Sequence, residues 1–157
     1  MSEETRIVTA ERLVRAEPEA IFELIADPAL QPSWDGNDNL AEAPAGQRVT
    51  GVGQTFTMEL TVGGTRENPV VEFEEGRRIA WKPSPLGEEP FGHLWRWELE
   101  PGAEPGVTLV RHTYDWSGLP GTAEPKRIAR ARGTTAEKLQ ASVDRLAAAA
   151  ESAEGAR

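Results

Sequence analysis

Several short stretches of the chain alternate apolar and polar residues, which is the two-residue period of strands with one buried face. In residues 53–62, one face carries Phe56, Met58, Leu60 and Val62, and the other carries three threonines and a glutamate. The same period predicts further strands over residues 6–15, 65–75, 77–83, 91–100 and 107–116. Turn sequences that contain glycine or proline separate the later strands, so we expect consecutive hairpins and an antiparallel sheet.

The orientation of the strand at 65–75 is open. Its alternation places Val71 and Phe73 on the inward face. Parity then directs Glu67 inward and Arg66 outward into solvent, unless Pro69 marks a bulge that reverses the assignment.

Two short helices are predicted after the first strand. Residues 18–26 begin with Pro18, which suits the first turn of a helix, and they space apolar residues at helical intervals. Residues 28–34 are expected to form a second short turn of helix.

A long helix is predicted at the C-terminal end, over residues 135–152. Its apolar stripe consists of Leu139, Val143, Leu146, Ala147 and Ala150. Thr134 and Glu137 have the spacing of a capping box at its start. Residues 122–132 are also expected to be helical, with Gly133 as the break between the two helices.

The hairpin of strands 91–100 and 107–116 carries most of the candidate chemistry. The expected register pairs one row of residues on a single face: Leu99 with Thr108, Trp97 with Val110, Trp95 with His112, and His93 with Tyr114. This face fits an aromatic-walled pocket with two imidazoles and a phenol as polar groups. It also fits an ordinary core in which the rings fill volume and each histidine makes one hydrogen bond.

Length and composition limit the kinds of protein and of functional site that the chain can form. The chain has 157 residues, and this length favours one domain over residues 1–157 with an ordered part of about 6–152. Its formal net charge is -9. The acidic balance argues against nucleic acid as a partner. The absence of cysteine excludes disulfides, thiolate metal sites and cysteine nucleophiles. No apolar run is long enough to span a membrane, and residues 1–5 lack the apolar core of a signal peptide, so we expect a cytoplasmic protein without membrane insertion.

Several short sequence segments, taken in their order along the chain, resemble those of the START/Bet v 1-like superfamily, also called the SRPBCC or polyketide cyclase/dehydrase-like group. These segments are AEPEAIF at 16–22, DP at 27–28, PSWD at 32–35, GVGQTF at 51–56 and LQASVDRL at 139–146. The match covers about residues 6–152. The resemblance implies an α+β helix-grip fold, in which a curved antiparallel sheet of six to seven strands wraps around the long C-terminal helix. It also implies a cavity for apolar ligands between the sheet and that helix.

Three functions follow as hypotheses. The first is binding of a small, largely apolar, aromatic or polycyclic molecule in the cavity. The second is an enzyme of the polyketide cyclase/dehydratase type that acts on a ligand in the same cavity, since an imidazole or phenol could move protons there. The third is a protein-interaction or stress-related module without a ligand. We expect a monomer or a homodimer and no cofactor.

The candidate catalytic residues are His112, His93 and Tyr114, although the chain contains no diagnostic catalytic motif. The residues expected to line the cavity are Trp34, Phe56, Met58, Leu60, Phe73, Trp81, His93, Trp95, Trp97, Val110, His112, Tyr114, Trp116, Leu139 and Val143. Trp34 could equally line or gate the cavity, or plug the end of the sheet. Two histidines without a third facing ligand do not indicate a metal site.

A small basic cluster precedes the last helix and consists of Lys126, Arg127, Arg130 and Arg132. In an acidic chain, a solvated helical face explains this cluster better than nucleic-acid binding.

Overall fold

The computed structural model describes residues 5–36, 38 and 40–155. Its elements are β1 (Ile7–Val14), α1 (Pro18–Ala26), the 3-10 helix η1 (Pro28–Ser33), β2 (Leu40–Glu42), β3 (Thr55–Leu60), β4 (Thr65–Glu74), β5 (Arg78–Trp81), β6 (Ser84–Pro85), β7 (Leu94–Pro101), β8 (Thr108–Asp115), α2 (Pro125–Arg132) and α3 (Ala136–Gly155). Within these residues, eight strands form one sheet in the order β1-β8-β7-β5-β4-β3-β2, with β6 paired to β4. All pairs are antiparallel.

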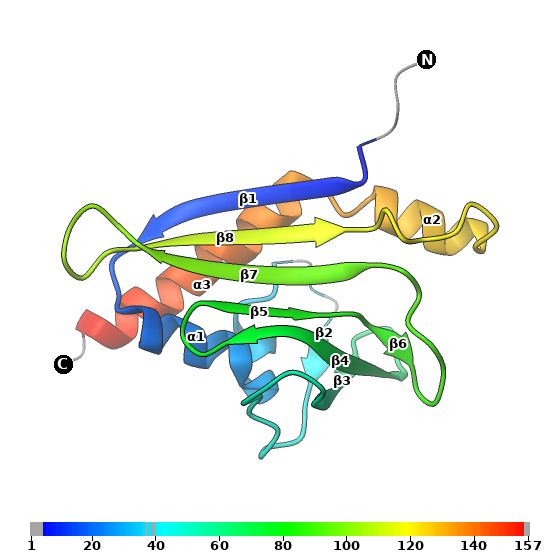
Figure 1. The fold of residues 1–157 in the computed structure, drawn as a ribbon, viewed down its shortest axis with the longest axis horizontal. Helices are drawn as coiled ribbons and strands as arrows, with labels where there is room; N and C mark the ends of the chain where they lie inside the picture. Colours follow the sequence, from blue (N-terminus) through cyan, green and yellow to red (C-terminus); the bar gives the residue numbers. More distant parts are fainter. Residues whose placement is uncertain (1–4, 37, 39, 156–157) are drawn as a thin grey trace.

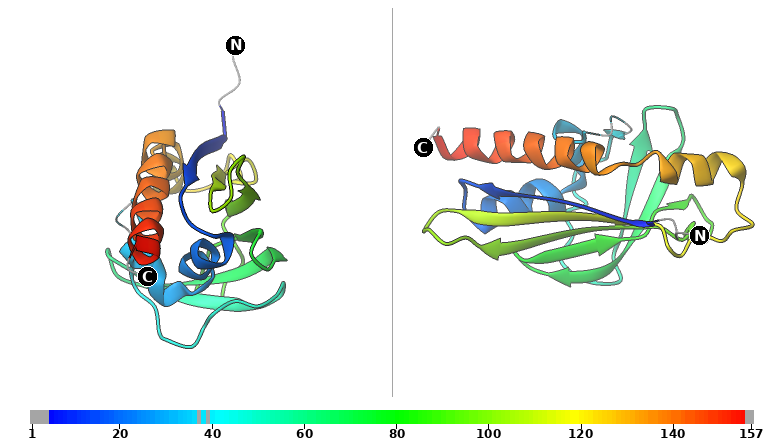
Figure 2. Two further views of the ribbon diagram at one scale, coloured as in Figure 1. Left: turned by 90° about the vertical axis from the view of Figure 1, so that its left-hand side faces the viewer. Right: turned by 90° about the horizontal axis from the view of Figure 1, so that it is seen from above.

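The sheet is curved, and α3 runs along one of its faces (Figure 1). Figure 2 shows α2 continuing the line of α3 beyond the end of the sheet, while α1 lies close to α3 at the opposite end. The predicted α+β helix-grip fold is therefore confirmed, and the short strands β2 and β6 add to the six that the alternation predicts.

The two short helices after β1 are confirmed, and they close one end of the sheet. Pro18 opens α1, which buries Ile21, Phe22 and Ile25 against the core. The Asp27 side chain accepts a hydrogen bond from the backbone amide of Ala29 at 3.1 Å, which starts η1 directly after α1.

The apolar stripe of α3 packs on the sheet as predicted. Its members are no more than 1% exposed: Leu139, Val143, Leu146, Ala147 and Ala150. The predicted capping box at Thr134 is wrong by one residue, because Thr135 accepts the hydrogen bond from the Lys138 amide. The hydroxyl of Thr134 instead donates to the carbonyl of Arg130 at 2.9 Å.

Two expected side-chain directions are wrong on β3 and β4. The β4–β5 register shifts between Val70 and Glu72, so Val70 is buried and Val71 is 38% exposed. This bulge lies after Val70, and Arg66 therefore shares the inward face with Val70. Val62 is 76% exposed because β3 ends at Leu60, where the chain turns.

The register of the β7–β8 hairpin differs from the expected one by two residues. Trp97 lies opposite His112, and Trp95 lies opposite Tyr114. The ladder extends to Pro101, one residue beyond the expected end of the strand, where Pro101 lies opposite Thr108. Since the shift is even, every side chain keeps its predicted face.

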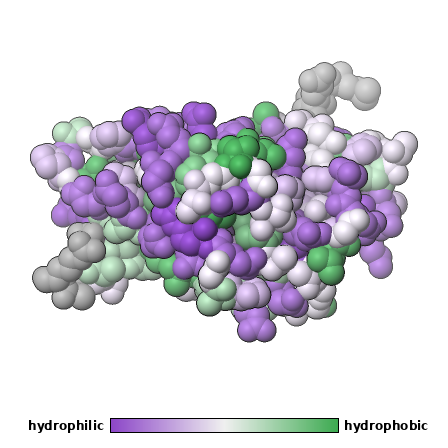
Figure 3. All heavy atoms as spheres, turned by 60° about the horizontal axis from the view of Figure 1, so that its bottom comes forward, coloured by the Kyte–Doolittle hydropathy of each residue, from purple (hydrophilic) through white to green (hydrophobic). Residues whose placement is uncertain are grey.

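The surface that Figure 3 shows is largely polar, with apolar residues in separate patches. In the part of the chain that the structure describes, we find no helix with the length and apolar character of a membrane span.

Candidate functional site

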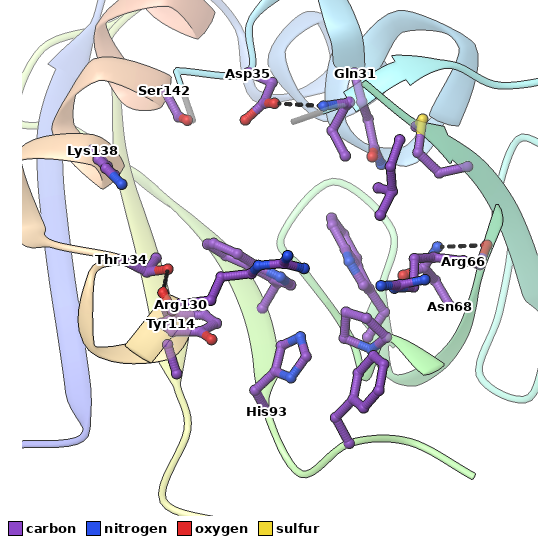
Figure 4. A pocket seen from close by; sticks show the side chains of 18 of the residues that line it. Gln31, Asp35, Arg66, Asn68, His93, Tyr114, Arg130, Thr134, Lys138 and Ser142 are labelled. Atoms are coloured by element: carbon purple, nitrogen blue, oxygen red, sulfur yellow. Dashed lines mark hydrogen bonds between the residues drawn. The ribbon is translucent and has the colours of Figure 1, made fainter. Parts of the chain in front are cut away.

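A cavity of about 350 Å³ lies between the inward face of the sheet and the segments η1, α2 and α3 (Figure 4). The sheet and the residue before β7 supply Leu40, Phe56, Met58, Leu60, Arg66, Asn68, Trp81, His93, Trp95, Trp97, His112 and Tyr114. The loops and helices add Gln31, Trp34, Asp35, Pro83, Phe91, Leu119, Glu124, Lys126, Arg127, Arg130, Ala131, Thr134, Lys138, Leu139 and Ser142. The volume is in the range of small-molecule sites, about 300–1,000 Å³.

Eleven residues that the sequence marks as cavity residues line this space: Trp34, Phe56, Met58, Leu60, Trp81, His93, Trp95, Trp97, His112, Tyr114 and Leu139. Phe73, Val110, Trp116 and Val143 do not line it. Val110 and Val143 are fully buried in the core, and Phe73 packs edge-on against Phe22 with ring centroids 5.6 Å apart. The core fills one end of the space between sheet and helix, and the cavity occupies the other.

His112 is a buried polar group of the wall, with only 3% of its surface exposed. Its ring stacks between those of Trp97, at 3.7 Å, and Trp95, at 5.3 Å. Its Nδ1 atom lies 3.0 Å from the carbonyl oxygen of Arg96, a group that can only accept. Burial lowers the pKa of His112 to about 3. The ring is therefore neutral, Nδ1 carries the proton, and Nε2 is the ring nitrogen that can accept a hydrogen bond.

Trp97 supplies a buried donor without a partner. Its Nε1 atom has no hydrogen-bond partner in the described structure, although the side chain is only 1% exposed. The neighbouring Trp34 meets its ring edge-on at 5.1 Å, but donates its own N–H to the carbonyl of Leu24 at 2.7 Å. Trp34 is therefore a fixed part of the wall. The N–H of Trp97 is therefore a buried donor without an acceptor among the described residues, which is uncommon in folded proteins.

His93 and Tyr114 are two further wall residues that are neutral at pH 7. Burial, with the positive charges of Arg66 and Arg127, lowers the pKa of His93 to about 4. Burial raises the pKa of Tyr114 to about 12. The Tyr114 hydroxyl is hydrogen-bonded to the side chain of Thr134, whose own proton goes to the Arg130 carbonyl.

The polar wall contains residues that sequence reasoning missed. Arg66 lies inward because of the β4 bulge, and α2 brings Lys126, Arg127 and Arg130 to the cavity. The i, i+3 spacing of Arg127 and Arg130 places them on one helical face, and this signal was available in the sequence. What the sequence does not show is that this face meets the end of the sheet.

Further polar side chains are held by the backbone. Asn68 is buried and donates to the Phe56 carbonyl at 3.3 Å. Gln31 donates to the Ile25 carbonyl at 2.9 Å, and Ser142 accepts from the Gly36 amide at 2.8 Å. In the described residues, no group of three His, Cys, Asp or Glu side chains could hold a metal ion.

Residues 5–151 match a family described as polyketide cyclase/dehydrase and lipid transport. No curated protein sequence matches the chain. Among solved structures, protein MLL2253 from Mesorhizobium loti is similar with a TM-score of 0.64 and 21% identity, covering 90% of this chain and 94% of that one.

Two further structures share the fold. Major latex-like protein 151 from Panax ginseng has a TM-score of 0.60 and 15% identity, covering 92% of this chain and 96% of that one. DynU16, from the dynemicin biosynthetic locus, has a TM-score of 0.59 and 22% identity. That match covers 92% of this chain and 46% of DynU16, so this chain spans about half the length of DynU16.

Proposed function

Because the chain belongs to the polyketide cyclase/dehydrase and lipid transport family, we propose that it binds a small, largely apolar, aromatic or polycyclic molecule in the cavity. The main support for the proposal is Trp97, a residue of the cavity wall whose buried N–H has no hydrogen-bond partner in the described structure. A buried donor without a partner costs about 1–3 kcal/mol, and a ligand carbonyl or hydroxyl would remove that cost.

The neighbouring groups support recognition of an aromatic body with few polar atoms. Trp95, Trp97 and the ring of His112 form one stacked column that presents apolar area to the cavity. Nε2 of His112 accepts and Nε1 of Trp97 donates, so a hydroxyl or carbonyl of the ligand has a matching group on the same wall.

The pKa values favour binding over acid–base catalysis. A general acid or base works best when its pKa lies near the working pH. The pKa is lowered to about 3 for His112 and about 4 for His93, and raised to about 12 for Tyr114. These groups therefore act as neutral hydrogen-bonding partners of the ligand.

A cyclase or dehydratase activity is the second candidate, and the Tyr114–Thr134 hydrogen bond favours it. That bond holds a neutral hydroxyl in a fixed direction at the cavity wall. In such an enzyme, rate acceleration would come from holding a flexible chain in one folded conformation. Turnover that Tyr114→Phe abolishes without loss of folding would favour this candidate over binding alone.

The test of binding is a melting experiment with aromatic, sterol, fatty-acyl and flavonoid-like compounds, with tryptophan fluorescence recorded in parallel. At 100 times its dissociation constant, a ligand stabilises the fold by about 2.7 kcal/mol, which raises the melting temperature of a chain of this size by roughly 5–10 °C. Quenching of tryptophan fluorescence should accompany the shift, since Trp95 and Trp97 line the cavity.

Two variants place the binding in the cavity. Leu60→Trp fills part of the cavity and should weaken a hit at least tenfold. Val62→Trp adds the same side chain at an exposed position nearby and should leave the affinity unchanged. The proposal would be contradicted if no compound of the panel shifted the melting temperature or quenched tryptophan fluorescence. Equal effects of the two variants on affinity would mean that the compound binds outside the cavity.

A further inference from the structure

Six arginines of this acidic chain form ion pairs with carboxylates, but none of these six lines the cavity. Ion pairs of 2.6–4.0 Å involve Arg12, Arg48, Arg78, Arg96, Arg111 and Arg145. In the part of the chain that the structure describes, no ion pair involves the five cationic side chains of the cavity wall, namely Arg66, Lys126, Arg127, Arg130 and Lys138. The wall contains two carboxylates, Glu124 and Asp35. The cavity therefore has an excess of positive charge in a chain whose net charge is -9.

These cations repel one another. Partial burial and the charges of Arg130 and Arg127 lower the pKa of Arg66. Burial lowers the pKa of His93, and the charges of Arg66 and Arg127 lower it further. An arrangement that costs electrostatic free energy points to a function, since perturbed charges gather at binding sites.

Two elements far apart in the sequence hold the guanidinium groups in place. Arg127, on α2, lies over the ring of Phe91 at 3.9 Å, and Arg66, on β4, lies over the same ring at 5.2 Å. Figure 4 shows the side chain of Arg130 extended into the cavity towards Arg66, with His93 beside them. Phe91 therefore helps to fix two of the three guanidinium groups.

An anion fits this arrangement. A guanidinium group presents several N–H donors in one plane and binds a carboxylate or phosphate through two of them. Lys126, Arg130 and Lys138 are exposed lining residues, so the cationic part of the wall borders solvent, whereas Phe56, Trp97 and His112 are buried in the apolar part.

We propose that the ligand is an amphiphile, with an apolar or aromatic body among the tryptophans and an anionic group, carboxylate or phosphate, bound by Arg66, Arg127 and Arg130. This inference rests on the proposed function and adds the chemical class of the ligand. The exposed end of the cavity holds the charge, and the buried end holds the body.

The experiment compares naphthol, naphthoate and naphthyl phosphate, which share one aromatic body and differ in the head group. Calorimetric titration of the wild-type chain should show that at least one anion binds tenfold or more tightly than naphthol. The tighter of the two anions distinguishes a carboxylate ligand from a phosphate ligand. Added salt should weaken binding of the anion and leave that of naphthol unchanged.

Four variants complete the design. Arg130→Gln, alone and combined with Arg66→Gln, should remove the preference for the anion and leave the affinity for naphthol within twofold. Arg130→Lys keeps the charge and should restore most of the preference. Arg77→Gln is the matched control, because it changes the net charge equally at an exposed position outside the cavity wall. Melting curves of the variants establish that they fold.

The outcomes separate the two proposals. The anion site would be overturned if the wild-type chain bound all three compounds with equal affinity, or if the double variant lost affinity equally for the anions and for naphthol. The apolar cavity would then remain as the binding site. If none of the three compounds binds, and no compound of the wider panel shifts the melting temperature or quenches tryptophan fluorescence, both proposals fail.

Discussion

Burial sets the protonation of the three residues that the sequence marks as candidate acids or bases. His112 and His93 are neutral because their surroundings disfavour a positive charge, and Tyr114 is neutral because its surroundings disfavour a negative one. The sequence identifies these residues, since their strand positions place them on one face. It does not identify the Arg96 carbonyl that fixes the tautomer of His112, because that contact depends on the exact register.

Tyr114 offers a direct measurement, since it is the only tyrosine of the chain. Its pKa, raised to about 12 by burial, predicts that ultraviolet absorbance of the folded protein shows phenolate only well above the usual value of about 10. When the phenol ionises, the Thr134 hydroxyl can turn from the Arg130 carbonyl and donate to the phenolate, which lowers this pKa. Thr134→Val removes that hydrogen bond and should shift the titration further upward. A midpoint near 10 in the folded protein would mean that water reaches the hydroxyl freely.

At the scale of elements, the segment after η1 is held against α3 by an unusually close approach at Gly36. A Cβ atom there would lie 2.6 Å from the carbonyl carbon of Ala141 and closer still to the amide nitrogen of Ser142. The Gly36 amide also donates to the Ser142 side chain at 2.8 Å. The contact positions Trp34 and Asp35 in the cavity wall.

Gly36→Ala should therefore force the segment away from α3 and lower the free energy of unfolding by about 1–3 kcal/mol, the usual cost of overpacking. Gly51→Ala is the control, because a Cβ atom there meets nothing within 4 Å. It should change stability by no more than about 0.5 kcal/mol. Urea denaturation of both variants tests this, and equal stabilities would show that the segment yields without cost.

The strands show which side-chain directions can be predicted from the sequence and which cannot. Alternation predicts the face of each residue in β7 and β8 correctly, because a shift of two leaves parity intact. It fails at Val71, because a bulge changes parity and the sequence holds only Pro69 as a hint. The same bulge turns Arg66 inward, so the cationic wall could not be deduced from alternation alone.

At the scale of the molecule, the fold divides its interior into a filled half and a hollow half. The family resemblance predicts the cavity, and the alternation predicts its aromatic wall. The cationic wall joins β4 to α2, more than fifty residues apart, and depends on where α2 lies against the sheet. Such a contact between distant elements carries no periodic signal in the sequence.

The two buried imidazoles also give the whole molecule a pH dependence of known sign. Their pKa values in the folded chain are about 3 for His112 and about 4 for His93, against about 6.5 in an unfolded chain. Between these values the unfolded chain binds protons that the folded chain does not. The free energy of unfolding therefore falls as the pH drops below about 6.5, by up to roughly 1.4 kcal/mol per pH unit for each histidine.

Urea denaturation at about pH 7, 6 and 5 measures this slope. Since these two are the only histidines of the chain, His93→Asn should remove about half of the slope between pH 6 and pH 5. Glu72, whose pKa is lowered by its hydrogen bond to Arg96, adds a loss in the same direction only below its ordinary value of 4.5. A stability that stays constant from pH 7 to pH 5 would mean that both rings accept protons in the folded chain, and then the wall around them must be open to water.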